Sequence, residues 1–462
     1  MKKTNLGAFI TLISIFFFWG FVAASNDILI PVFKKALTLT QLQSQLISFA
    51  FYVAYTVGSI LYFVISSALK KDILNLIGYR NGLALGLVIS ALGTLLFIPA
   101  SNNASFTLLI SGLFVVGLGF SLQQIAANPL AIQMGDPEKG NIRLSMAGGI
   151  NNVGTTIGPV IVSFAIFGGV AGNTTLNLEA VKMPYLILGA AFLVAAIVFK
   201  FSSVPDRIGD ENRNESKSGD ILETLKYPQV WLGMIAIFLY VGVEVATASN
   251  LPEFMKAKLG TPENQVSPYV SLFWASLMIG RWTSAAGAFD ISKTTKNILG
   301  VILPFVAFGI FLFVNYLAGE KLDVFYPYLG VVLVLIAADK LSDGNAVRQI
   351  ILYSVLGIIG LLIGIFSSGM LSVFAFISVG LFCSTLWPCI FTLGISGLDD
   401  KSNIASSLLI MMIMGGAVIP ILQGALASDE LMGIQNSYWV GVLCFTYLAF
   451  FAWYVGKRRQ NK

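Results

Sequence analysis

The chain alternates between long apolar runs and short polar segments from one end to the other. Most of the apolar runs are about 20 residues long or longer, enough for a helix to cross roughly 30 Å of hydrocarbon, and a helix satisfies its own backbone hydrogen bonds in lipid. The pattern predicts an all-α polytopic membrane protein. In the first part of the chain, we expect spans near residues 7–32, 42–67, 81–100, 104–132, 143–168 and 183–202. In the second part, we expect spans near residues 229–252, 267–289, 296–317, 326–339, 346–367, 370–395, 403–427 and 436–456.

The longest hydrophilic segment of the chain is S-S-V-P-D-R-I-G-D-E-N-R-N-E-S-K-S-G-D, directly after the sixth predicted span. Its composition is typical of a flexible linker between two halves. We therefore expect an N-terminal six-helix bundle at residues 1–202, a cytoplasmic linker at 203–228 and a C-terminal bundle at 229–462. The C-terminal bundle has two spans more than the first, which we interpret as an inserted hydrophobic hairpin near residues 296–339.

The two halves resemble each other in sequence. The segment L-T-L-T-Q-L-Q-S-Q-L-I-S-F-A-F-Y-V-A-Y-T-V-G, from Leu37, aligns without gaps on L-G-T-P-E-N-Q-V-S-P-Y-V-S-L-F-W-A-S-L-M-I-G, from Leu259. The motif K-G-N-I at Lys139 matches K-S-N-I at Lys401 in the same way, and a helix containing a proline follows each motif. Parallel six-helix repeats joined by a central linker indicate the major facilitator fold, which places the substrate near the midplane between its halves.

Lysine and arginine residues in the loops predict the orientation of the chain. If the N-terminus is cytoplasmic, most of the basic residues fall in cytoplasmic loops, including the linker and the terminal K-R-R-Q-N-K. We therefore expect both termini in the cytoplasm and the protein in the inner membrane of a bacterium. The opposite side then holds only Lys34, Lys35, Lys182, Lys256, Lys258 and Lys321.

Composition excludes several classes of protein. Only 11% of the residues are charged and 56% are hydrophobic, whereas soluble domains carry roughly 25% charged residues. The net charge of +5 comes from short loops between spans, so we expect no nucleic-acid partner. The chain has no histidine, and its three cysteines, Cys383, Cys389 and Cys444, fall in predicted helices as small packing residues. No nucleophile–base set or metal cluster is visible, so we expect neither an enzyme nor a cofactor.

Three ionisable residues interrupt the apolar runs: Asp27, Glu244 and Arg281. A charge near the centre of a bilayer costs roughly 2.5–3.5 kcal/mol on insertion scales, so such residues are functional candidates. The repeat places Asp27 and Glu244 on matching helices of the two halves. Alternatively, Asp27 reaches the headgroup region from a helix end, and Glu244 pairs with a neighbouring helix. For Arg281 we favour an interhelical ion pair or backbone clamp at a cytoplasmic gate over contact with substrate.

Uncharged polar residues add a second set of candidates. Gln124 and Asn128 are four residues apart and therefore share a helix face, and Asn151 and Asn152 lie in the fifth helix. Amide groups both donate and accept hydrogen bonds, which suits a neutral polyhydroxylated ligand. Trp387, beside Pro388, would offer a flat apolar face to a sugar ring. The alternatives are interhelical hydrogen bonding for the amides and lipid contact for the indole.

At these residues the chain resembles the fucose permease family, the sugar–cation symporters of the major facilitator superfamily. The resemblance rests on F-F-F-W-G-F-V-A-A-S-N-D-I-L-I-P, Q-Q-I-A-A-N-P-L, I-R-L-S-M-A-G-G-I-N-N-V-G-T-T-I-G-P, Y-V-G-V-E-V, M-I-G-R-W and W-P-C-I-F-T-L-G-I. The chain is more similar to the glucose/galactose branch, which has glutamine and glutamate at the positions of Gln124 and Glu244. The fucose branch has a carboxylate and an amide there. The hairpin near 296–339 also resembles the glucose/galactose branch.

The resemblance implies roles for individual residues. Asp27 matches the first-helix carboxylate implicated in cation coupling, Asn151 matches a sugar-contacting amide, and Trp387 matches an aromatic residue beside the tenth-helix proline. One position departs from the family, because the fifth-helix glutamine of the fucose permeases corresponds to Gly148. Fucose is therefore the less favoured sugar.

We expect a secondary active transporter that imports a neutral hexose, glucose or galactose, with a monovalent cation by alternating access. Gln124, Asn128, Asn151, Asn152, Glu244 and Trp387 would bind the sugar, and Asp27 with Asn26 would couple the cation. We favour sodium over a proton because the glucose/galactose branch, which the chain resembles, includes sodium-dependent members. Without histidine, proton carriage would fall on Asp27 or Glu244, whereas sodium needs only a carboxylate such as Asp27 and further oxygen ligands. The alternatives are a proton-coupled symporter of the fucose type and, in a different class, a drug or lipid exporter. We expect a monomer surrounded by lipid.

Overall fold

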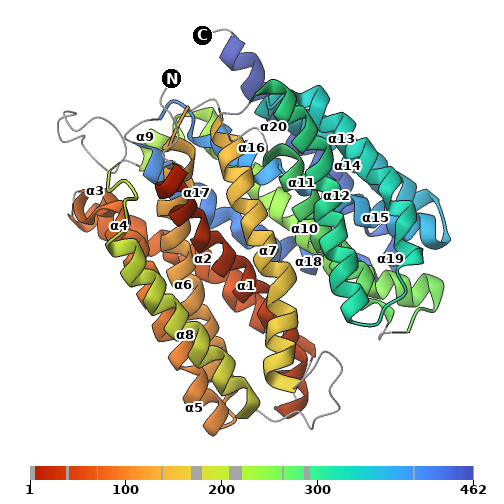
Figure 1. Cartoon of the computed structure of the whole chain (residues 1–462), viewed down its shortest axis with the longest axis horizontal. Helices are drawn as coiled ribbons and strands as arrows, with labels where there is room; N and C mark the ends of the chain where they lie inside the picture. The colour runs from red at the N-terminus through yellow and green to blue at the C-terminus, as the bar shows by residue number, and fades with distance from the viewer. Residues whose placement is uncertain are drawn as a thin grey trace. The chain divides into compact units, whose positions relative to one another are not determined.

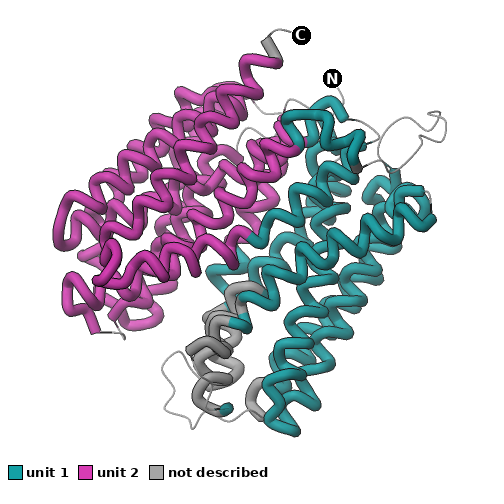
Figure 2. The backbone as a smooth tube through the Cα atoms, turned by 180° about the vertical axis from the view of Figure 1, so that it is seen from behind, with its two compact units in different colours: residues 1–136, 153–230, 395–414 teal, residues 137–152, 231–394, 415–462 magenta. Residues whose placement is uncertain are grey.

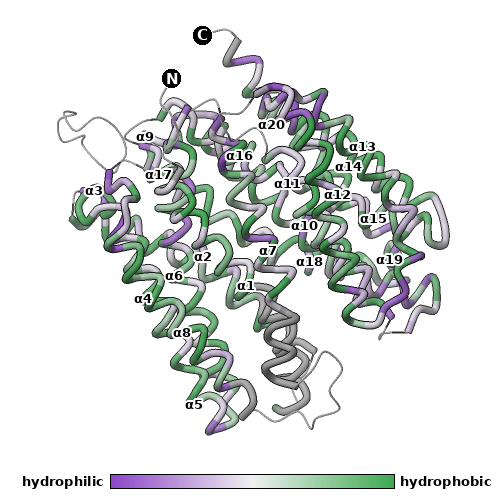
Figure 3. Tube along the Cα trace, in the orientation of Figure 1, coloured by the Kyte–Doolittle hydropathy of each residue, from purple (hydrophilic) through white to green (hydrophobic). Residues whose placement is uncertain are grey.

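The computed structural model describes residues 6–37, 41–69, 71–136, 139–167, 179–207, 221–262, 265–285, 292–398 and 401–460. Regular secondary structure in these ranges is helical, without strands (Figure 1). Eleven helices in the described residues are long and apolar enough to cross a membrane. Figure 3 shows apolar residues along α4 (Tyr79–Leu95) and α8 (Glu179–Lys200), with hydrophilic residues near their ends. The prediction of an all-α polytopic membrane protein is confirmed.

The observed helices follow the predicted spans in order. Before the linker, the remaining elements are α1 (Leu6–Ala36), α2 (Gln41–Leu69), α3 (Ile73–Ile77), α5 (Phe97–Asn102), α6 (Phe106–Gln133) and α7 (Gly140–Phe167). After it, they are α9 (Ile221–Leu225), α10 (Pro228–Leu259), α11 (Ser267–Ala285), α12 (Lys293–Leu317), η4 (Asp323–Tyr328), α13 (Leu329–Ser342), α14 (Ala346–Phe366), α15 (Gly369–Cys383), α16 (Leu386–Ile395), α17 (Ser402–Met411), η6 (Met412–Met414), α18 (Gly415–Leu426), α19 (Gly433–Asn436) and α20 (Trp439–Gln460).

Several predicted spans are interrupted in the structure, and the span near 81–100 divides into α4 and α5. The span near 370–395 divides into α15 and α16, and the span near 403–427 contains the short 3-10 segment η6. Conversely, α10 continues beyond the expected end at residue 252, through Pro252 to Leu259. Helix interruptions within membranes occur where other protein groups satisfy the freed backbone, so the break before α16 is a place to look for such groups.

The chain forms two compact units (Figure 2). Unit 1 comprises residues 1–136, 153–230 and 395–414, and unit 2 comprises residues 137–152, 231–394 and 415–462. Each unit therefore contains a short segment from the other half of the sequence. The expected division at 1–202, 203–228 and 229–462 describes the repeat along the chain and stays a prediction.

The repeat is visible in the helix packing within each unit. In unit 1, α4 packs against α6 and α8, and α2 packs against α6. In unit 2, α14 packs against α15 and α20, and α11 packs against α15. The patterns correspond if α11 is the counterpart of α2 and α14 the counterpart of α4, in agreement with the alignment of Leu37 on Leu259. In this correspondence α12 and α13 are additional, at the place where the sequence predicts a hairpin.

Glycines allow the closest of these helix contacts. A Cβ atom at Gly119 of α6 would lie 2.4 Å from the carbonyl oxygen of Gly86 on α4. In unit 2, a Cβ atom at Gly380 of α15 would lie 2.6 Å from the carbonyl oxygen of Phe273 on α11. Small residues that let backbones approach are a general device of helix packing in membranes.

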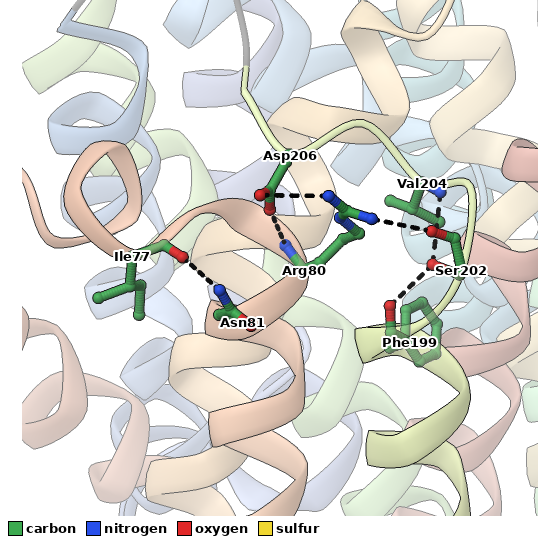
Figure 4. Close-up of polar contacts among 7 residues, drawn as sticks. All are labelled: Ile77, Arg80, Asn81, Phe199, Ser202, Val204 and Asp206. Carbon is green, nitrogen blue, oxygen red and sulfur yellow. Dashed lines mark hydrogen bonds and ion pairs between the residues drawn. The ribbon is translucent and has the colours of Figure 1, made fainter.

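The segment after α8 is fastened to the start of α4 by Arg80 (Figure 4). Its guanidinium forms an ion pair with Asp206 at 3.3 Å and donates a hydrogen bond to the carbonyl oxygen of Ser202 at 3.1 Å. Gly78 precedes α4 with φ +86°, and a Cβ atom there would lie 2.4 Å from the Asp206 carboxylate. The glycine is thus required both by its backbone conformation and by the position of Asp206.

Candidate functional site

A carboxylate, a phenol and an indole gather between α10 and α16 in unit 2. The Tyr240 hydroxyl donates a hydrogen bond to the Glu244 carboxylate one turn later on α10. The Tyr240 ring lies 6.2 Å from the ring of Trp387, which in turn stacks on Phe391 at 5.8 Å. Glu244 and Trp387 are partly buried, whereas Tyr240 is buried. An acceptor of hydrogen bonds beside a flat apolar face is the combination expected for a sugar ring.

The break between α15 and α16 positions Trp387. In a continuous helix, the carbonyl oxygen of Ser384 would accept a hydrogen bond from the backbone nitrogen of residue 388. That residue is Pro388, which has no N–H to donate. The Nε atom of Arg281 donates to this oxygen instead, at 2.8 Å. The charged side chain thus stabilises the interruption that presents Trp387 in the first turn of α16.

Arg281 also joins α11 to the first part of α7. Its Nη1 atom donates to the side-chain oxygen of Asn152 at 2.8 Å and to the carbonyl oxygen of Gly148 at 3.0 Å. Arg281 is 9% exposed and Asn152 is 3% exposed, and charged hydrogen bonds of this kind are the stronger ones. The structure therefore places Arg281 in a backbone clamp. Its role as a gate stays a prediction.

Two glycines make room for this clamp. A Cβ atom at Gly148 would lie 2.9 Å from Nη1 of Arg281, and a Cβ atom at Gly149 would lie 2.8 Å from the indole of Trp282. The Trp282 indole nitrogen donates to the Gly149 carbonyl oxygen at 3.3 Å. The close approach of the guanidinium thus accounts for the glycine at position 148.

Electrostatics link the two parts of this cluster. The positive charge of Arg281 acts on Glu244 and on the Tyr240 hydroxyl from the neighbouring helix. Opposite charges favour one another in a low-dielectric interior. The cluster therefore combines an acidic side chain and a cationic one, with Tyr240 hydrogen-bonded to the carboxyl group of Glu244.

In unit 1, the two adjacent glutamines of α6 face different partners. Gln124, which is partly buried, donates to the Tyr55 hydroxyl at 3.2 Å. Gln123 is fully buried, accepts from the Trp19 indole at 2.8 Å and donates to Ser90 at 3.1 Å. Gln123 thus holds three helices together, and Gln124 is the more accessible of the pair.

Asn128 lies one turn beyond Gln124 and is 1% exposed. Neither its side-chain oxygen nor its side-chain nitrogen has a hydrogen-bond partner among the described residues. A buried amide without partners costs about 1–3 kcal/mol. Such a cost is compensated when a polar ligand binds.

The remaining expected site residues lie on α7 and α1. Asn151 is partly buried on α7, next to Asn152. Asn26 and Asp27 belong to α1, but their side chains lie outside the described residues. The expected cation site therefore rests on the sequence alone.

Several polar partners were missed by the sequence reasoning. Tyr240 stands four residues before Glu244, a spacing that places both on one helix face, so the sequence carried this signal. Asp339 was counted only as the end of a predicted span, yet its carboxylate accepts hydrogen bonds from Ser284 and Gln349. No local pattern indicates that contact, because the three residues lie on different helices.

Comparison with known proteins agrees with this architecture. The sequence profile of the Major Facilitator Superfamily matches residues 6–338. The chain is 31% identical to the glucose/galactose transporter of Brucella abortus, over 97% of this chain and 94% of the relative. It is 26% identical to the L-fucose-proton symporter of Escherichia coli, over 100% of this chain and 95% of that protein.

Solved structures show the same fold. The crystal structure of the Escherichia coli fucose:proton symporter matches with a TM-score of 0.74 at 22% identity, covering 98% of this chain and 99% of that chain. These matches confirm the resemblance drawn from the sequence motifs.

Proposed function

Because the chain belongs to the major facilitator superfamily, whose members transport solutes across membranes, we propose that it is a secondary active transporter of a neutral hexose. The observation that carries this proposal is the Tyr240–Glu244–Trp387 cluster, in a chain 31% identical to a glucose/galactose transporter. Glucose and galactose are accordingly the first candidate sugars. A sugar of the fucose type is the second, since a fucose symporter is among the relatives.

Each candidate residue has a proposed role in binding the sugar. Glu244 accepts hydrogen bonds from sugar hydroxyls, and Trp387 stacks against the ring. The amides of Gln124, Asn128 and Asn151 bind further hydroxyls. The amide of Asn128, which has no hydrogen-bond partner within the part of the chain that the structure describes, supports this role. Asn152 is a further candidate for sugar binding, and its side-chain oxygen accepts a hydrogen bond from Arg281.

The sugar is proposed to move together with a cation bound at Asp27 and Asn26. The sequence alone favoured sodium, but the cation named for the fucose relative is the proton. We therefore propose a proton as the first candidate and sodium as the second. Either cation is compatible with a carboxylate in the first helix, since a carboxylate binds a proton or a metal ion.

Membrane location and orientation complete the proposal. The protein is a multi-pass membrane protein of the superfamily. Its relatives named above are bacterial, which supports the bacterial inner membrane. The distribution of lysine and arginine supports cytoplasmic termini. An exporter of drugs or lipids is less favoured, because four of the candidate residues carry amide side chains that suit a hydroxylated ligand: Gln124, Asn128, Asn151 and Asn152.

Uptake of radiolabelled sugar into proteoliposomes tests the proposal. Purified protein is reconstituted, and glucose, galactose and fucose are supplied under an inward proton gradient, an inward sodium gradient or neither. Concentrative uptake under the proton gradient alone would support proton symport, and uptake under the sodium gradient alone would restore the sodium assignment. Folded protein that accumulates none of the sugars under either gradient would refute the proposal.

A further inference from the structure

The inserted hairpin places a carboxylate in a polar junction of unit 2. Asp339, near the end of α13, accepts a hydrogen bond from the Ser284 hydroxyl of α11. The same oxygen accepts from the side-chain nitrogen of Gln349 on α14, at 3.3 Å, and this nitrogen also lies 3.1 Å from the Ser284 hydroxyl. Gln349 is 2% exposed. None of the described lysines or arginines forms an ion pair with Asp339, so neutral donors hold it.

The junction continues from Gln349 to α16 and α7. The thiol of Cys389 donates to the side-chain oxygen of Gln349 at 3.2 Å. The side chain of Asn141, in the first turn of α7, lies 3.8 Å from the Cys389 sulfur and donates to the carbonyl oxygen of Gly344 at 3.3 Å. Gly344 belongs to the turn between α13 and α14. One chain of polar contacts therefore joins the hairpin to four other helices, α11, α14, α16 and α7.

Unit 1 contains a junction of the same design without a hairpin. The Tyr62 hydroxyl of α2 donates to the Asp72 carboxylate at 2.8 Å, and the Asn403 amide of α17 donates to it at 3.2 Å. Extending the gapless alignment of Leu37 on Leu259 pairs Tyr62 with Ser284. In each unit, a hydroxyl at the same repeat position thus donates to an aspartate.

The asparagines of the repeated K-G-N-I and K-S-N-I motifs reinforce the correspondence. Asn403 begins α17 and contacts both Asp72 and Tyr79, the first residue of α4. Asn141 begins α7 and contacts the turn before α14, the counterpart of α4. The short connection after α2 supplies the acid in unit 1. In unit 2 the hairpin, α12 and α13, separates α11 from α14 along the chain. The acid of this junction, Asp339, is therefore supplied by the end of α13, the last part of the hairpin before α14.

We propose that the inserted hairpin contributes to transport by holding neighbouring helices in position, and that Asp339 is the positioning residue. Through Ser284 and Gln349 it holds the end of α11 to the start of α14, and through Cys389 and Asn141 it positions the first part of α7. That part of α7 carries Asn152, the partner of Arg281. A second attachment, between the Tyr328 and Ser276 hydroxyls at 2.7 Å, fixes the hairpin farther along α11.

The thiol of Cys389 provides a direct test of this coupling. Cys383, Cys389 and Cys444 are the only cysteines of the chain, and all are free and buried. In a full-length chain with Cys383→Ala and Cys444→Ala, the rate of Cys389 modification by N-ethylmaleimide is measured in liposomes without sugar. We expect Asp339→Leu to raise this rate about three- to tenfold, since Gln349 loses an acceptor that orients it. Asp339→Asn, which keeps an accepting oxygen, should raise it less.

Matched variants keep the test decisive. Asp343→Asn changes an exposed acid in the turn that follows α13 and should leave the labelling rate unchanged. Ser284→Ala removes one donor only and replaces Asp339→Leu if that variant does not fold. Labelling at the parental rate in folded Asp339→Leu and Ser284→Ala would overturn the proposal.

Sugar uptake by the same liposomes supplies a second readout, which rests on the proposed function. We expect Asp339→Leu to lower turnover several-fold while the KM for sugar stays within about twofold, and Asp339→Asn to recover part of the turnover. Equal loss in both variants would contradict positioning through the accepting oxygen. Because labelling needs no substrate, a parent chain that carries no hexose would refute the proposed function and leave the junction standing.

Discussion

Arg281 donates to the carbonyl oxygen of Ser384 at 2.8 Å, the oxygen that Pro388 leaves without a helical partner. The same guanidinium reaches the Asn152 side chain on α7 at 2.8 Å. The helix break that presents Trp387 and the attachment of α7 to α11 therefore depend on one side chain. A group with this geometry couples the aromatic face of the candidate site to the position of a neighbouring helix.

Replacing Arg281 with lysine tests the clamp. Lysine keeps the charge but lacks the planar fork, which reaches two oxygens on α7 and the Ser384 oxygen in the break between α15 and α16 at the same time. We expect Arg281→Lys to lower the free energy of unfolding by about 1.5–3 kcal/mol, the range for a hydrogen bond to a charged group, and to lower uptake at least tenfold. Thermal denaturation and proteoliposome uptake measure the two effects. Arg348→Lys, at an exposed position of α14, is the control and should behave as wild type.

Adding a methyl group at Gly148 should disturb the same clamp from the opposite side. The new Cβ atom would lie 2.9 Å from Nη1 of Arg281, so the guanidinium must shift. We expect Gly148→Ala to destabilise the protein by about 1–3 kcal/mol, as overpacking does. Gly309→Ala on α12, where nothing lies within 4 Å of the new atom, should instead be neutral or stabilise by up to about 1 kcal/mol. Equal melting temperatures for both variants would contradict the steric argument.

Glu244 should matter more for the sugar than for the cation. Removing its charge weakens hydrogen bonds worth about 1.5–3 kcal/mol, so we expect Glu244→Gln to raise the sugar Kd by about ten- to a hundredfold. Tyr240→Phe, which removes the hydroxyl that orients the carboxylate, should raise it less. Isothermal titration of sugar and of cation against each variant separates the effects. An unchanged sugar Kd in Glu244→Gln would remove this residue from the site.

Asp27 should couple the two fluxes. If its carboxylate binds the co-transported cation, Asp27→Asn abolishes accumulation against a gradient but leaves exchange of sugar across the membrane measurable. Counterflow and concentrative uptake in the same proteoliposomes distinguish these activities. Loss of both to the same extent would mean that Asp27 instead builds the sugar pocket.

Asp72 should make stability depend on pH. Burial raises the pKa of Asp72, opposed by hydrogen bonds from Tyr62, the Asn75 backbone and Asn403. A raised pKa means that the folded state binds the proton more tightly than the unfolded state. The protonated carboxyl group therefore contributes to the free energy of unfolding. This contribution is fully present when the pH is below the pKa of the unfolded chain, about 3.9, and it is lost as the pH rises through the higher pKa of the folded state.

We therefore expect the melting temperature of the wild type to fall, relative to that of Asp72→Asn, as the pH rises from about 4 towards 7. Scanning fluorimetry across this range measures the difference. Asp343→Asn, at an exposed acid, should show no such trend. A wild-type curve parallel to that of Asp72→Asn would show that this carboxylate does not titrate differently in the two states.

The sequence by itself determined the membrane helices, the repeat and the position of the hairpin. These features follow from local composition, because a lipid-facing helix must be apolar along its length wherever it lies in the fold. The same reasoning identified Glu244 and Arg281 as candidates, since inserting a charged residue into the membrane costs free energy and such residues are therefore functional candidates.

Only the tertiary structure decided what those polar groups contact. Arg281 binds Gly148, which lies 133 residues away in the chain, and Asp339 binds Ser284 across 55 residues. Such partners depend on which helices pack together and in which register, and a hydropathy pattern specifies neither. The first part of α7 likewise joins unit 2 although it precedes the linker. The apolar pattern of each helix follows from the lipid that surrounds it. Hydrogen-bond partners, in contrast, depend on which helices, distant in the sequence, pack beside it.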